Sequence, residues 1–234
     1  MGHRIEIDVP GIGAVGGWFA RPEGAPRGAL VVIQEIFGVN AHMRNVADYY
    51  AQDGFVALAP AMFDPVERDV ELGYDAEGFQ RGKTLVGALG FERAMKIVDA
   101  AARVLHGEHL GVGAVGFCWG GTVAYLANTR LELPAVSYYG ARTVQFLDEP
   151  LRAPMLFHFG ERDESIPADD IAAHAAKHPE AMVHVYPAGH AFNRDVDPKA
   201  FVPESAALAR RRTLEFFSAH LSASSKRSND GAVP

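Results

Sequence analysis

Short aliphatic runs alternate with segments of helical periodicity along most of the chain, and this alternation constrains the fold more than any other feature. Residues 29–33 form an uninterrupted apolar run, which is typical of a strand buried on both faces. A helix follows that Asn40 caps and Gly54 ends, with apolar residues at i, i+3, i+4 and i+7. Residues 55–58 form the next strand. A strand, a helix and a strand in this order indicate a parallel crossover unit.

The same alternation predicts the rest of the sheet. We expect further strands at 113–116, 135–137, 155–159 and 182–186, and helices through 94–105, from about 120, near 168–178 and at about 203–221. Strands around 4–8 and 18–20 precede them, and Gly16 and Gly17 are expected to form the turn of this opening hairpin. The prediction is an α/β fold: a mostly parallel sheet of about eight strands, with about six helices on both of its faces.

Composition supports one domain. The chain has 234 residues, of which 48% are hydrophobic, so it can form an ordinary packed core. No shift in composition marks a domain boundary within residues 1–221, which we therefore assign to a single domain. Residues 222–234 contain too little apolar surface to offset the entropy of ordering, and we expect a disordered tail there.

Charge and hydropathy narrow the possible partners. The formal net charge of −7 repels a phosphate backbone, so we expect no nucleic-acid partner. The longest aliphatic run, residues 29–33, is far shorter than the roughly 20 residues that span a bilayer, and we expect no membrane partner and a cytoplasmic location. The single cysteine, Cys118, excludes an internal disulfide framework.

Cys118 lies between a predicted strand and a predicted helix, in the segment Gly116-Phe117-Cys118-Trp119-Gly120-Gly121. This spacing matches the nucleophile elbow, with cysteine at the position of the usual serine. Glycines two residues before and two after leave room for the sharp turn, and the following helix directs its N–H groups at the thiol. The alternative is a buried structural cysteine, which is common for lone cysteines. The elbow spacing favours a nucleophile.

Two later residues stand where an acid and a base are expected, each after a predicted strand. Asp163 follows residues 155–159, and His190 follows residues 182–186. The chain order of nucleophile, acid and histidine would let His190 activate the Cys118 thiol while Asp163 orients the imidazole. Glu161 is the main alternative to Asp163 for the acid.

Four segments resemble those of the dienelactone hydrolase family, and the likeness extends over nearly the whole chain. The segments are Gln34–Asn40 (QEIFGVN), Gly116–Gly121 (GFCWGG), Tyr138–Gly140 (YYG) and Ala188–Arg194 (AGHAFNR). The resemblance implies a single-domain α/β-hydrolase fold with a Cys-His-Asp triad. It also implies carboxymethylenebutenolidase activity, which opens the lactone ring of dienelactone to give maleylacetate.

The resemblance assigns further residues. It makes Glu35 a partner of the resting thiol, which holds the thiol proton until substrate displaces the carboxylate. The backbone N–H groups of Ile36 and Trp119 would form the oxyanion hole. Arg194 and Arg81 would bind the carboxylate of the substrate. Arg81 lies within residues 60–91, a segment that departs from the family pattern and that we expect to cross one end of the sheet, with only a weak helical stretch near residues 79–88.

No cofactor and no metal are expected. Two segments, residues 11–16 and 111–116, spell the dinucleotide fingerprint G-x-G-x-x-G, but neither has the strand, turn and helix that this motif requires. The expected function is hydrolysis of a carboxylate-bearing lactone or ester by a monomer or small homo-oligomer. Two alternatives remain open: another ester or lactone handled by the same residues, and a ligand-binding protein without catalysis.

Overall fold

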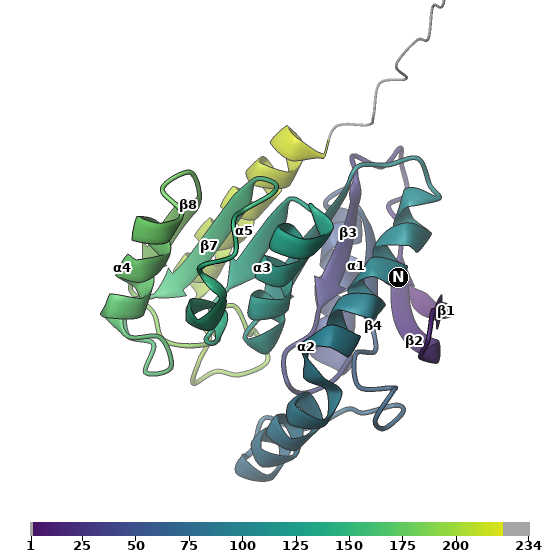
Figure 1. Cartoon of the computed structure of the whole chain (residues 1–234), viewed down its shortest axis with the longest axis horizontal. Coiled ribbons are helices and arrows are strands. Elements are labelled where there is room, and N and C mark those ends of the chain that lie inside the picture. The colour runs from purple at the N-terminus through teal and green to yellow at the C-terminus, as the bar shows by residue number, and fades with distance from the viewer. Residues whose placement is uncertain (1, 222–234) are drawn as a thin grey trace, which may run out of the picture.

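The computed structural model describes residues 2–221, so the tail predicted at 222–234 lies outside the described residues. Eight strands form one sheet (Figure 1). They are β1 (His3–Val9), β2 (Gly13–Ala20), β3 (Ala29–Ile33), β4 (Val56–Pro60), β5 (Val112–Phe117), β6 (Ala135–Tyr138), β7 (Met155–Gly160) and β8 (Met182–Tyr186). The helices are α1 (Ala41–Gln52), α2 (Ala76–His106), α3 (Trp119–Leu131), α4 (Ala168–Lys177) and α5 (Pro203–His220), with a short 3-10 helix, η1 (Thr143–Phe146).

The sheet is mostly parallel, as predicted. Its strand order is β1-β2-β4-β3-β5-β6-β7-β8, with β1 and β2 antiparallel to each other and β2 antiparallel to β4. All other neighbours are parallel. The order and the direction of the strands are those of an α/β-hydrolase. The carboxyl ends of the parallel strands therefore meet at one edge of the sheet.

Helices cover both faces of the sheet, which is also as predicted. Figure 1 shows α1 and α5 on one face and α2, α3 and α4 on the other. Because both faces are covered, every residue of β3, β4, β5, β6 and β7 is buried, and these strands carry long apolar runs instead of an alternating pattern. No helix within residues 2–221 combines the length and the apolar character that a bilayer span requires.

Helix α2 is long and bent. Gly90 has φ 72° and ψ 159° inside it, a conformation that favours glycine, and it divides α2 into two helical segments. The first contains the weak helix predicted at 79–88, and the second contains the helix predicted at 94–105. The first segment projects beyond the sheet at the bottom of Figure 1, so the excursion predicted for residues 60–91 does cross one end of the sheet.

The opening hairpin turns at a different place from the predicted one. The turn lies between β1 and β2, where Gly11 (φ 76°) and Gly13 (φ 105°) adopt left-handed backbone conformations. Gly16 and Gly17 instead lie inside β2, paired with β1. Strand β4 crowds Gly17, because a Cβ there would come within 3.1 Å of the Leu58 side chain. These glycines mark a close approach between strands, which a local turn signal cannot distinguish from a turn.

Candidate active site

The predicted catalytic side chains meet at the carboxyl edge of the sheet. Glu35 follows β3, Cys118 follows β5, Asp163 follows β7 and His190 follows β8. These four strands run parallel, so the loops that leave them emerge on the same side. The fold thus brings together residues that are up to 155 positions apart in the sequence.

Cys118 occupies a sharp turn between β5 and α3. Its backbone has φ 56° and ψ −121°, a strained conformation that costs about 1–3 kcal/mol and that surrounding contacts must hold. The Cys118 N–H donates to the Tyr138 carbonyl at 3.0 Å, and the Cys118 carbonyl accepts from the Gly121 N–H at 2.9 Å. The half-buried thiol lies at the N-terminus of α3, where the helix dipole favours a thiolate.

Two glycines make this turn possible. A Cβ on Gly116 would lie 1.8 Å from the Gly120 carbonyl oxygen, and a Cβ on Gly120 would lie 2.3 Å from the Gln34 carbonyl oxygen. Both contacts are far below any real Cβ distance, so any larger residue would force the backbone apart. The glycines of the elbow motif therefore have a steric cause.

His190 and Asp163 form a hydrogen-bonded pair beside the thiol. His190 Nδ1 lies 2.7 Å from Asp163 Oδ2, and the other carboxylate oxygen accepts from the Ser165 N–H at 2.8 Å. The Asp163 side chain is fully buried. Because Nδ1 faces Asp163, the other ring nitrogen, Nε2, is left to act on Cys118, which borders the same cavity.

The electrostatics of this pair favour a charged imidazole. Burial lowers the pKa of His190, but the negative charge of a Cys118 thiolate and the hydrogen bond to Asp163 outweigh burial and raise that pKa to about 10. The arrangement therefore favours a charged imidazole at His190 near neutral pH. Glu161, the alternative acid, is exposed and makes no side-chain hydrogen bond within residues 2–221, whereas Asp163 is aimed at the imidazole.

Ile36 and Trp119 lie where an oxyanion hole is expected. Both border the same cavity as Cys118, and neither backbone N–H has a hydrogen-bond acceptor within residues 2–221. The Trp119 ring stacks between Phe63 and Phe91, with centroids 6.0 and 6.4 Å away. Helix α2 holds the Ile36 loop closely, because a Cβ on Gly82 would come within 2.2 Å of the Ile36 carbonyl oxygen. Both N–H groups are thus free and firmly placed.

Glu35 is paired with Arg194, not with the thiol. Arg194 Nε and Nη2 donate to the two Glu35 oxygens at 3.0 and 2.9 Å, and both side chains are buried. The resemblance made Glu35 a partner of the resting thiol, but the guanidinium fork of Arg194 occupies both of its oxygens, and this fork matches a carboxylate better than a thiol does. Burial lowers the pKa of Arg194, but the Glu35 charge outweighs it and keeps the guanidinium charged.

Aromatic rings complete the surroundings of the Glu35–Arg194 pair. The Arg194 guanidinium lies 4.4 Å from the Tyr74 ring centroid and 5.2 Å from that of Phe37. The buried Tyr139 ring lies 5.0 Å from the His190 ring. Burial and the negative charge of Glu35 raise the pKa of Tyr139, so its phenol stays neutral. The Glu35–Arg194 pair and these rings therefore form part of the wall around the thiol.

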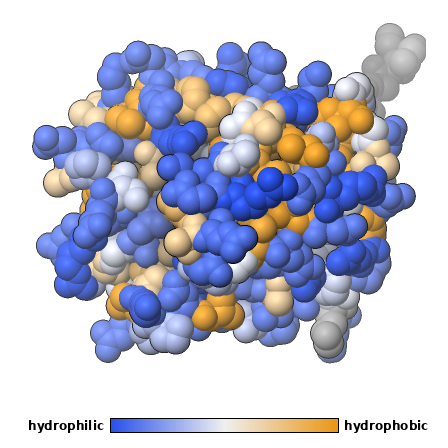
Figure 2. Space-filling model, turned by 90° about the horizontal axis from the view of Figure 1, so that it is seen from below, coloured by the Kyte–Doolittle hydropathy of each residue, from blue (hydrophilic) through white to orange (hydrophobic). Residues whose placement is uncertain are grey.

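Cys118 opens into a cavity of about 450 Å³, which we call the Cys118 cavity. Its volume suits a small organic ligand. It is lined by Ile36, Phe37, Tyr74, Asp75, Ala76, Phe79, Lys83, Val86, Cys118, Trp119, Ala141, Arg142, Ser165, His190 and Arg194. Figure 2 views the molecule from the side on which α2 projects, and shows hydrophobic residues in patches between hydrophilic ones.

The structure does not bring Arg81 into the Cys118 cavity. Arg81 is exposed and pairs with Glu67. Successive residues of a helix are about 100° apart, so Arg81 points away from the face of α2 on which Phe79 and Lys83 line the cavity. Lys83 and Arg142 are the cations that the sequence analysis missed. The signal for Lys83 was its i, i+4 spacing from Phe79, and Arg142 is the second residue after the YYG segment.

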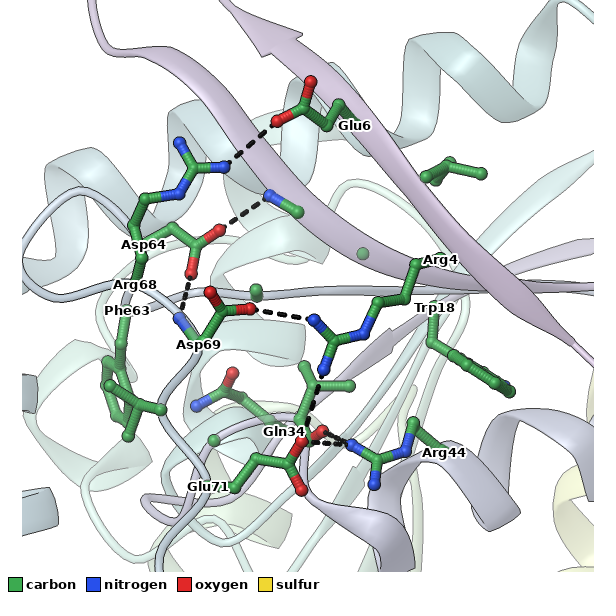
Figure 3. A pocket seen from close by; sticks show the side chains of 17 residues that line it. Arg4, Glu6, Trp18, Gln34, Arg44, Phe63, Asp64, Arg68, Asp69 and Glu71 are labelled. Atoms are coloured by element: carbon green, nitrogen blue, oxygen red, sulfur yellow. Dashed lines mark hydrogen bonds and ion pairs between the residues drawn. The ribbon is translucent and has the colours of Figure 1, made fainter.

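A second pocket of about 320 Å³ lies beside the β1–β2 hairpin, and we call it the Arg4 pocket after one of its lining residues (Figure 3). Its three arginines are all bound to carboxylates: Arg4 to Asp69 and Glu71, Arg44 to Glu71, and Arg68 to Glu6. It contains neither a thiol nor a histidine. Within residues 2–221, no group of three or more His, Cys, Asp or Glu side chains is placed to hold a metal ion.

Known proteins resemble the chain in sequence and in structure. The sequence profile described as "Dienelactone hydrolase family" matches residues 15–221. The carboxymethylenebutenolidase of Pseudomonas sp. strain P51 is 31% identical over 90% of this chain and 92% of its own length, and that of Pseudomonas putida is 32% identical over 83% and 87%. The crystal structure of a candidate dienelactone hydrolase from Klebsiella pneumoniae superposes with a TM-score of 0.80 at 28% identity, covering 94% of this chain and all of that one. The chain belongs to the dienelactone hydrolase family and is a hydrolase of that kind.

Proposed function

We propose that the protein hydrolyses a carboxylate-bearing lactone or ester through Cys118, His190 and Asp163, with dienelactone as the expected substrate and maleylacetate as the product. The observation that carries the proposal is the hydrogen-bonded pair Asp163–His190, whose imidazole borders the Cys118 cavity together with the Cys118 thiol. The names of the Pseudomonas relatives support the choice of substrate.

In the proposed first step, the Cys118 thiolate attacks the carbonyl carbon, and the electron pair of the C=O bond moves to its oxygen. The N–H groups of Ile36 and Trp119 hold that oxyanion. When the intermediate collapses, the bond to the leaving oxygen breaks and His190 gives this oxygen its proton. For a lactone, the leaving oxygen stays attached to the acyl group, so the ring is open while the thioester persists.

In the proposed second step, water attacks the thioester. His190 takes a proton from the water, and Cys118 leaves as the thiolate, which restores the starting state. Asp163 orients the imidazole through both steps and stabilises its charge. No cofactor is needed for this sequence of bonds.

The Glu35–Arg194 pair is one proposed point of contact with a substrate carboxylate. A carboxylate that binds Arg194 must replace Glu35, since both guanidinium nitrogens that face the pair are occupied. We propose that this exchange couples binding to the chemistry, because the displaced Glu35 carboxylate becomes free to accept a proton in the cavity.

We further propose that the enzyme acts in the cytoplasm as a monomer or small homo-oligomer on a free small molecule. A reducing compartment preserves the free thiol of Cys118, on which the proposed chemistry depends. In this proposal the substrate is the one partner of the enzyme, and neither nucleic acid nor a membrane takes part.

The test is hydrolysis of dienelactone followed by ultraviolet absorbance, with Cys118→Ala as the control and a neutral aryl ester for comparison. Turnover of dienelactone well above the aryl ester, lost in the variant, would support both the nucleophile and the substrate. Cys118-dependent hydrolysis of the aryl ester alone would retain the mechanism and reject dienelactone. The absence of Arg81 from the Cys118 cavity favours testing other anionic esters as well.

A further inference from the structure

Two cations of the Cys118 cavity have no part in the proposed mechanism. Lys83 comes from α2 and Arg142 from the loop after β6, and both side chains are exposed at the opening of the cavity. Neither forms an ion pair with a carboxylate of residues 2–221. Within residues 2–221 the side chain of Arg142 makes no hydrogen bond, whereas the guanidinium groups of Arg81 and Arg194 are each bound to a carboxylate.

These cations leave the opening of the cavity positively charged. Arg194 is neutralised by Glu35. Among residues 2–221, Asp75 is the only carboxylate that lines the cavity, and it caps α2 by accepting the Gly78 N–H at 2.8 Å. Lys83 and Arg142 outnumber this carboxylate, so the lining keeps a net positive charge in a chain whose net charge is −7. A positive site on an otherwise negative protein attracts small anions.

An apolar wall accompanies the cations. Phe79 is 46% exposed, an unusual degree for a phenylalanine, and it lines the cavity. The Lys83 ammonium lies 5.6 Å from the Phe79 ring centroid, and Val86 follows on the same helix face. A ligand that extends from the thiol towards the opening of the cavity therefore contacts hydrocarbon before it reaches the two cations.

We propose that Lys83 and Arg142 form an anion subsite at the opening of the Cys118 cavity, which binds the carboxylate of an acyl group whose other end is attacked by Cys118. The inference rests on the proposed function and names its substrate class: esters or lactones of dicarboxylic acids, with hydrocarbon between the two carboxyl carbons. An anion at Arg194 must displace Glu35 from a buried pair. An anion at the subsite displaces only water.

The test compares two esters that differ only in the terminal group. Mono-4-nitrophenyl adipate and 4-nitrophenyl hexanoate have the same leaving group and the same acyl length, but only the first ends in a carboxylate. The measured quantity is the ratio of kcat/KM for adipate to that for hexanoate. The variants are Lys83→Ala, Arg142→Ala and the double variant, with Lys96→Ala, an exposed lysine of α2 outside the cavity, as the matched control.

We expect the ratio to fall about threefold in each single variant and about tenfold in the double variant, mainly through KM for the adipate ester. The wild-type ratio should also fall as salt is raised from 0.05 to 0.5 M, because salt screens exposed charges. Lys96→Ala should keep the wild-type ratio. A ratio within twofold of wild type in the double variant would overturn the subsite, as would a preference for adipate that disappears only in Arg194→Met.

A binding measurement separates failure of the subsite from failure of the proposed function. Titration calorimetry of adipate into Cys118→Ala, with and without the Lys83→Ala and Arg142→Ala changes, does not depend on catalysis. At least fivefold weaker binding in the triple variant supports the subsite. Equal binding, or no binding to Cys118→Ala, overturns it. Hexanoate hydrolysis that persists in Cys118→Ala rejects the proposed nucleophile and leaves the binding result to decide the subsite.

Discussion

The Arg4 pocket and the Cys118 cavity are both lined by arginines, but they use them differently. In the Arg4 pocket every arginine is bound to one or two carboxylates (Figure 3). In the Cys118 cavity Arg194 is paired, while Lys83 and Arg142 are not paired within the described chain. Each lining therefore contains three arginine or lysine side chains, but the number of these cations left for a ligand differs.

The backbones of the two regions also differ. The Arg4 pocket lies beside the antiparallel edge of the sheet, where β1 and β2 pair along their length. The Cys118 cavity lies where parallel strands end, and it contains the strained Cys118. Backbone strain and free N–H groups are each costly, and at the cavity they coincide with two unpaired cations. Their coincidence, more than charge or volume, distinguishes a reactive site from a structural pocket.

The largest effect is expected for Cys118→Ala. Removing the proposed nucleophile should lower kcat/KM for an activated ester by about four orders of magnitude. Circular dichroism should show an unchanged fold, because alanine is smaller and the turn is held by backbone hydrogen bonds. Activity above one tenth of wild type would remove the distinction drawn between the two regions, since the strained residue would then have no chemical role.

Asp163→Asn should have the next largest effect. Loss of the buried carboxylate should reduce kcat about 10²-fold, which is less than in serine triads because a thiol needs less activation. The pH profile gives a second readout. Activity of the wild type should fall as pH rises through about 10, where His190 loses its proton. Without Asp163 the pKa of His190 is lower, so this fall should begin at a lower pH.

Glu161→Gln is the matched control for Asp163→Asn, since Glu161 is the neighbouring exposed carboxylate. It should change neither kcat nor the pH at which activity falls. If Glu161→Gln moves the limb and Asp163→Asn does not, the acid has been assigned to the wrong residue.

Glu35→Gln should change stability more than any variant of the Arg4 pocket does. It leaves the buried Arg194 with only the Asp197 carboxylate, 3.2 Å away, and we expect a loss of about 3 kcal/mol in the free energy of unfolding, measured with urea. The double variant Glu35→Leu, Arg194→Met should recover most of that loss, because no buried charge is left unpaired. Equal losses in both variants would mean that packing, and not charge, stabilises this wall.

Much of the fold could be predicted because its signals are local. The strand predicted at 113–116 is β5 (Val112–Phe117), and the cap predicted at Asn40 accepts the Met43 N–H at 3.2 Å. The predicted position of the hairpin turn was wrong because contacts with distant residues, and not a turn, account for the glycines at positions 16 and 17. Leu58 approaches Gly17, and the Asp64 carboxylate binds the Gly16 N–H. Such contacts leave no trace in a short window of sequence.

The candidate site shows the same division. Cys118, Asp163 and His190 could be placed together because each follows a strand of a parallel sheet, which fixes the side from which they emerge. The position of Arg81 depends on the rotation of α2 about its axis, and a contact distant in sequence, that of Gly82 with the Ile36 carbonyl, helps to fix this rotation. The pairing of Glu35 with Arg194 joins residues 159 positions apart, and only the folded chain specifies it.

The smallest effect is expected for Arg68→Ala, which removes the Arg68–Glu6 pair of the Arg4 pocket. Both side chains are more than half exposed, so the free energy of unfolding should change by about 0.5 kcal/mol or less, and kcat/KM should stay within twofold of wild type. One structural connection between the two regions would explain a larger loss of activity. Gln34 lines the Arg4 pocket and its side-chain amide donates to the Glu35 carbonyl at 3.2 Å, so a disturbance could pass through this loop to the Cys118 cavity. A loss of more than threefold in kcat/KM with unchanged stability would therefore show that the two regions are coupled.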